Sequence, residues 1–100
     1  DDKLPYDEKA FDKRVREADV RPFLESYRAL LAATDSFAAA DLEQKTRAFV
    51  EEAGIKIGTA VNAIRVAVTG KGTGPGLYDA LELLGRDRCI ARLDRALARL

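Results

Sequence analysis

Apolar side chains recur along this chain mainly at the three- and four-residue intervals of an α-helix. The clearest case is residues 20–31, where Pro22 is acceptable only in a first helical turn. A shorter helix is predicted over residues 7–17, with Asp7 as its N-terminal cap. A third is predicted over residues 39–53, where Gly54 would end it.

The second half of the chain continues the helical pattern with two interruptions. Gly58 and Thr59 precede a stretch whose β-branched residues could form a strand, but its interleaved alanines and lack of a turn favour a helix ending at Thr69. Residues 70–76 are rich in glycine and form a loop. Helices are then predicted over 77–84 and 86–100. The whole pattern predicts an all-α fold, a compact bundle or cage of about six helices.

Length and composition favour one domain. The chain has 100 residues, which is the ordinary size of a single domain. Residues 1–5 are interpreted as a linker from an upstream domain, and residues 6–100 as the helical domain. The first residues do not resemble a signal peptide, and no long uncharged run suits a bilayer. The cytoplasm is therefore the expected compartment.

The side chains most used in catalysis and zinc binding are scarce. There is no histidine and a single cysteine, Cys89. The commonest general base is thus absent, and an ordinary zinc site cannot be built. We expect Cys89 to be a packed helix residue. No catalytic residue and no metal ligand is predicted.

Charge is divided unevenly along the chain although the total is zero. Residues 1–53 carry 9 basic and 13 acidic side chains, whereas residues 54–100 carry 8 and 4. The basic half ends in a helix whose arginines lie opposite its apolar residues, namely Arg88, Arg92, Arg95 and Arg99. Such a stripe could follow RNA phosphates, but a solvated helix face is the favoured interpretation.

Several short motifs follow one another in the basic half. They are Arg65-Val66-Ala67-Val68-Thr69-Gly70, Gly74-Pro75-Gly76-Leu77, Leu83-Leu84-Gly85-Arg86-Asp87-Arg88 and Ala91-Arg92-Leu93. This series resembles the C-terminal anticodon-binding domain of bacterial-type glutamyl-tRNA synthetases, which are class I aminoacyl-tRNA synthetases. The stretch Tyr6-Asp7-Glu8-Lys9-Ala10 is similar to the start of that domain. The resemblance therefore covers nearly all of the chain.

The resemblance implies a helical cage that grips the anticodon loop of a tRNA and reads the second and third anticodon bases. Arg65 would read the third base, and the backbone around Gly74, Pro75 and Leu77 would contact the second and third. These roles fit RNA chemistry, because unstacked bases expose hydrogen-bonding edges and a guanidinium can donate two bonds at once. Without the resemblance, a salt bridge would be the favoured role for Arg65.

One position departs from the family pattern. Gly74 stands where members often carry Thr or Ser, so no side-chain hydroxyl is expected there, and Thr73 offers the nearest one. Lys71 and Thr73 complete the predicted RNA-binding residues. The glycine-rich loop is not expected to bind a nucleotide, because a P-loop needs a Gly-Lys-Ser/Thr ending after a strand.

The chain itself is thus expected to be non-catalytic and without a cofactor. The resemblance implies a parent chain with an upstream catalytic domain that uses ATP and Mg²⁺ to attach glutamate to tRNA. The residues leave open whether glutamine tRNA is charged as well. Neither DNA nor a membrane is an expected partner. The alternative function is a small helical scaffold or protein-interaction module without RNA binding, and a stand-alone enzyme is disfavoured.

Overall fold

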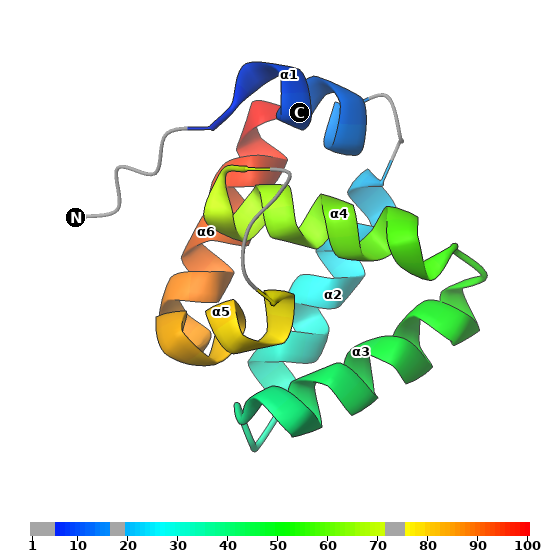
Figure 1. Cartoon of the computed structure of the whole chain (residues 1–100), viewed down its shortest axis with the longest axis vertical. Helices are drawn as coiled ribbons and strands as arrows, with labels where there is room; N and C mark the ends of the chain where they lie inside the picture. The colour runs from blue at the N-terminus through cyan, green and yellow to red at the C-terminus, as the bar shows by residue number, and fades with distance from the viewer. Residues whose placement is uncertain (1–5, 17–19, 72–75) are drawn as a thin grey trace.

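The computed structural model describes residues 6–16, 20–71 and 76–100. Six α-helices and one π-helical turn make up most of this part of the chain, and no strand occurs in it (Figure 1). Both the all-α prediction and the predicted number of helices are therefore confirmed. The elements are α1 (Glu8–Phe11), the π-helical turn η1 (Asp12–Arg16), α2 (Arg21–Ala33), α3 (Ala39–Ala53), α4 (Ile57–Thr69), α5 (Leu77–Leu84) and α6 (Arg86–Arg99).

The ends of several helices have the predicted local causes. The Asp7 carboxylate caps α1 by accepting hydrogen bonds from the backbone N–H groups of Lys9 and Ala10, at 3.1 and 3.3 Å. Pro22 lies in the first turn of α2. Gly54 follows α3 with a φ of 74°, a left-handed conformation that glycine adopts without a steric penalty.

Two predicted helices differ in detail from the structure. The helix expected over residues 7–17 is α-helical only to Phe11 and continues as η1, and its predicted last residue lies outside the described ranges. The π-helical turn leaves both Phe11 and Val15 fully buried. Helix α4 begins at Ile57, so Gly58 lies inside its first turn instead of before it.

Helix α4 is the centre of the domain. It contacts every other helix and η1, and it crosses the middle of the molecule in Figure 1. Ala60, Ala63, Ile64, Val66, Ala67 and Val68 are all buried. A helix enclosed on most sides needs apolar residues around most of its circumference. This explains why its sequence resembles a buried strand as much as an amphipathic helix.

Helix α6 differs from the expected arrangement of an apolar stripe opposite a solvated arginine stripe. Its buried residues are Cys89, Leu93 and Ala96, whereas Leu100, just after the helix, is 39% exposed. Because α6 packs against α2, α4 and α5, the buried surface is wide. Three of the arginines that were expected to face solvent, Arg92, Arg95 and Arg99, are partly buried.

The described residues form one core with the dimensions of an independent domain. The radius of gyration is 12.1 Å, close to the roughly 13 Å expected for a folded chain of this length. Cys89 is fully buried, which confirms its predicted packing, and burial raises the pKa of its thiol to about 12. No helix in the described ranges is long and apolar enough to span a membrane.

Candidate functional site

The predicted base-reading residue, Arg65, lies in the C-terminal half of α4 and is partly buried. Its backbone carbonyl accepts a hydrogen bond of 2.6 Å from the hydroxyl of Thr69, one turn later. That hydroxyl oxygen in turn accepts a bond from the backbone N–H of Lys71, at 3.3 Å. Arg65 is therefore linked through Thr69 to Lys71, the second residue of the glycine-rich loop.

The loop begins where α4 ends, at Gly70. This residue has a φ of 81°, and its N–H donates to the carbonyl of Val66 at 2.8 Å. Only a residue without a Cβ adopts this conformation at little cost, so the chain can turn sharply away from the helix. The side chain of Lys71 is exposed directly after the turn. Three of the predicted RNA-binding residues, Thr73, Gly74 and Pro75, lie outside the described residues.

The far side of the loop is the start of α5, which packs beside α4 (Figure 1). Leu77 as a whole residue is only 2% exposed, so neither its side chain nor its backbone is open to a contact in this structure. The N–H groups of a first helical turn have no carbonyl partner inside the helix. No side chain caps this end among the described residues. The first turn of α5 therefore has backbone donors without a helical partner, whereas the backbone contact predicted for Leu77 stays a prediction, since this residue is buried.

An acidic side chain lies at the same end of α5. A Cβ placed on Gly76 would come within 3.3 Å of a carboxylate oxygen of Asp79. The carboxylate stabilises the positive end of the helix dipole. Its negative charge also disfavours a phosphate at that position.

Two residues outside the predicted RNA-binding set form hydrogen bonds with the C-terminal end of α4. The guanidinium of Arg92 donates to the carbonyl of Val68 at 2.7 Å. The backbone N–H of Asp7 donates to the carbonyl of Gly70 at 2.8 Å. Both lie within motifs of the family resemblance, but no periodicity in the sequence indicates that they meet the end of α4.

The arginine stripe of α6 does not form a solvated row. Arg92 is bonded to α4, and Arg99 forms an ion pair with Glu8 while it lies 4.9 and 4.8 Å from the ring centres of Tyr6 and Phe11. These contacts hold the N-terminal segment against α6. The favoured interpretation of the stripe as a solvated face is therefore wrong for Arg92 and Arg99, and Arg95 is partly buried as well, whereas Arg88 is exposed.

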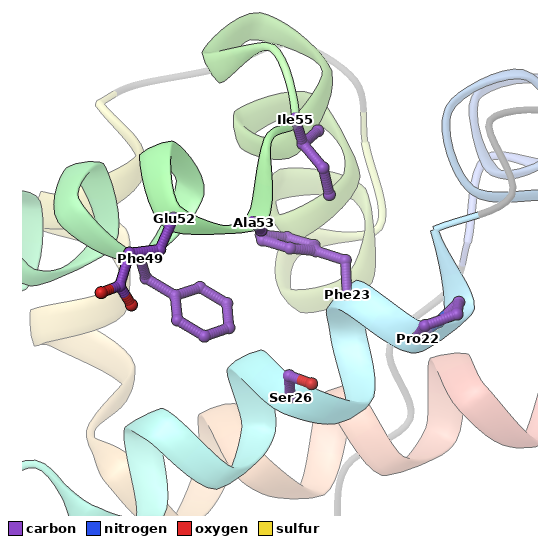
Figure 2. Close-up of a pocket in the computed structure, with 7 residues that line it drawn as sticks. All are labelled: Pro22, Phe23, Ser26, Phe49, Glu52, Ala53 and Ile55. Carbon is purple, nitrogen blue, oxygen red and sulfur yellow. The ribbon is translucent and has the colours of Figure 1, made fainter.

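A separate groove lies between α2 and α3, and its lining includes none of the predicted RNA-binding residues that the structure describes (Figure 2). It has a volume of about 390 Å³, and its charged lining residue is Glu52. The rings of Phe23 and Phe49 lie 5.6 Å apart beside it. An apolar groove with a carboxylate does not suit a phosphate backbone. Among the described residues, no group of three His, Cys, Asp or Glu side chains could hold a metal ion.

Comparison with known proteins agrees with the motif series. The family model described as "Anticodon binding domain" matches residues 1–97. Similar proteins include the glutamate–tRNA ligases of Rhodopseudomonas palustris strain TIE-1, 41% identical over 90 residues, and of Anaeromyxobacter sp. strain Fw109-5, 41% identical over 94 residues. The matches cover 90% and 94% of this chain but 19% and 20% of those proteins.

A more distant relative is the glutamate–tRNA ligase of Chloroherpeton thalassium, 34% identical over 95 residues that cover 95% of this chain and 19% of that protein. This chain thus spans about a fifth of the length of these relatives. Because the family model matches nearly all of its residues, the predicted resemblance is confirmed, and the chain belongs to the anticodon-binding domain family.

Proposed function

We propose that this chain binds the anticodon loop of a tRNA and reads its second and third anticodon bases. The observation that carries the proposal is the match of the anticodon-binding family over residues 1–97, together with Arg65 and the start of α5 on either side of one loop. Arg65 would donate two hydrogen bonds to the third base. The backbone at Gly74, Pro75 and Leu77 would contact the second and third.

Lys71 and Thr73 have supporting roles in the proposal. The exposed ammonium group of Lys71, next to Gly70, would attract a phosphate of the RNA. Thr73 would supply the hydroxyl that Gly74 lacks. Overall charge contributes little, because the chain carries 17 basic and 17 acidic residues. Recognition would therefore depend on the geometry of the loop more than on general attraction.

The activity of the longer protein is also part of the proposal. The relatives are named glutamate–tRNA ligases. By this likeness, an upstream catalytic domain would use ATP and Mg²⁺ to attach glutamate to a tRNA in the cytoplasm. The chain described here would supply affinity and anticodon identity to that reaction.

The test is binding to anticodon stem-loops at fixed salt. Loss of the bidentate contact in Arg65→Ala is expected to cost about 1–3 kcal/mol, a roughly 5- to 150-fold weaker Kd for the cognate loop. Arg65→Lys keeps the charge but not the planar fork, so it should lose discrimination at the third base while keeping most of the salt-dependent affinity.

Arg14→Ala is the matched control, because Arg14 is an exposed cation on η1. It should leave discrimination unchanged. If Arg65→Ala binds every loop as the unmodified chain does, Arg65 has no part in reading. If the unmodified chain does not bind the stem-loop but captures a protein partner, the alternative of a protein-interaction module is favoured, and the groove in Figure 2 is where that partner would be sought.

A further inference from the structure

The N-terminal segment of the domain crosses the C-terminal end of α4. The hydroxyl of Tyr6 lies 2.9 Å from the carbonyl oxygen of Ala67 and 3.1 Å from that of Arg92, so its single proton is shared between α4 and α6. The next residue, Asp7, donates its backbone N–H to Gly70. Residues separated by about 60 positions in the sequence therefore meet at the point where the loop begins.

These contacts satisfy groups that a helix leaves unpaired. The last four carbonyls of an α-helix have no N–H partner within it. At the end of α4, the carbonyl of Ala67 accepts from Tyr6, that of Val68 from Arg92, and that of Gly70 from Asp7. The donors come from two other parts of the chain, so the end of α4 is capped by tertiary structure.

The ring of Tyr6 is fixed independently of its hydroxyl. It packs edge-on against Phe11, with ring centres 5.2 Å apart, and the guanidinium of Arg99 lies over its face. The hydroxyl is therefore directed at α4 by a ring that has its own supports. A change of Tyr6 to phenylalanine would remove the hydrogen bonds and keep these ring contacts.

We propose that Tyr6 is a positioning residue for anticodon reading, because its hydroxyl fixes the end of α4 from which the base-reading loop departs. This inference rests on the proposed function. Arg65 lies two residues before Ala67, the first residue with a capped carbonyl, and Lys71 follows Gly70 directly. Loosening the cap would displace both sides of the reading site together, although Tyr6 itself touches no base.

The experiment compares Tyr6→Phe with Tyr27→Phe in the 100-residue chain. Tyr27 is a matched control because the same substitution also removes a hydroxyl hydrogen bond, to Thr46, but does not touch the end of α4. The readout is the ratio of Kd values for a cognate anticodon stem-loop and for one with a substituted third base. Hydrogen exchange of the Lys71 amide is measured in the same variants without RNA, after thermal unfolding has shown that each is folded.

Tyr6→Phe is expected to reduce the Kd ratio roughly 2- to 10-fold, the equivalent of one hydrogen bond, and to speed exchange at Lys71. Tyr27→Phe should lower Tm yet leave the ratio and the exchange at Lys71 unchanged. The inference is overturned if Tyr6→Phe keeps the original ratio, or if both variants lower it equally. Absence of discrimination in the unmodified chain would instead overturn the proposed function.

Discussion

A hydroxyl pair inside the core gives a quantitative test of the fold. The oxygen atoms of Tyr27 on α2 and Thr46 on α3 lie 2.7 Å apart, and their residues are 0% and 1% exposed. In Tyr27→Phe the Thr46 hydroxyl loses this buried partner, and in Thr46→Val the Tyr27 hydroxyl does. An orphaned buried group costs about 1–3 kcal/mol, so each single variant should lose about that much stability.

The double variant should be more stable than the sum of the single losses indicates. When both partners become apolar groups of similar shape, no hydroxyl is left buried without a partner. We therefore expect a coupling energy of roughly 0.5–3 kcal/mol, the range found for residues in direct contact. In a domain of this size, each kcal/mol corresponds to a Tm change of roughly 4–8 °C.

Chemical unfolding followed by circular dichroism measures the free energy of unfolding of the unmodified chain, the two single variants and the double variant. Strictly additive losses would refute the assigned role of the hydrogen bond.

The pH dependence of stability gives a second check. Burial raises the pKa of Tyr27 above its ordinary value of 10.0, so the folded state favours the protonated phenol. The stability that it contributes is complete below pH 10 and is lost as pH rises through the folded-state pKa. Tyr27→Phe should remove that part of the alkaline loss.

Two further predictions concern a pair of glycines and the cysteine. Gly54→Ala places a Cβ on a residue in the left-handed region and should lower the free energy of unfolding by about 1–2 kcal/mol. Gly58→Ala should be stabilising, because Gly58 lies inside α4 and its new Cβ would meet nothing within 4 Å. Thermal unfolding that ranks the two variants in the opposite order would contradict this prediction. Because Cys89 is fully buried and burial raises the pKa of its thiol, alkylation at pH 8 should be much slower in the folded chain than in the unfolded one. Equal rates would show that Cys89 is accessible.

Local patterns predicted the helices well because their causes are local. Asp7 caps α1, Pro22 opens α2 and Gly54 follows α3, and each acts through its own backbone geometry. The prediction for the arginines of α6 was partly wrong because the causes of their burial are not local. A helical projection shows one preferred buried direction, but α6 packs against three helices at once. Arg92 and Arg99 are drawn inward by a carbonyl and by two aromatic rings from distant parts of the chain.

The candidate site could be predicted only through the order of its motifs. Nothing in the spacing around Arg65 distinguishes a base-reading arginine from one in a salt bridge. Periodicity likewise gave no sign that Tyr6 would meet Ala67, because the contact joins residues 61 positions apart. The contact forms because the last carbonyls of α4 need hydrogen-bond donors. Which residue supplies the donor depends on how the helices pack, and the sequence pattern does not give that arrangement.

The closeness of the first and last helices has a consequence for synthesis on the ribosome. Glu8 pairs with Arg99 across 91 positions, and Tyr6 bonds to Arg92 across 86. Such long-range contacts form late, since the loop they close must first be ordered. The contacts of Tyr6 and Glu8 with α6 would remain unmade until α6 has left the ribosome. The cap on α4 therefore reaches its final form only after nearly every other residue of the domain has been made.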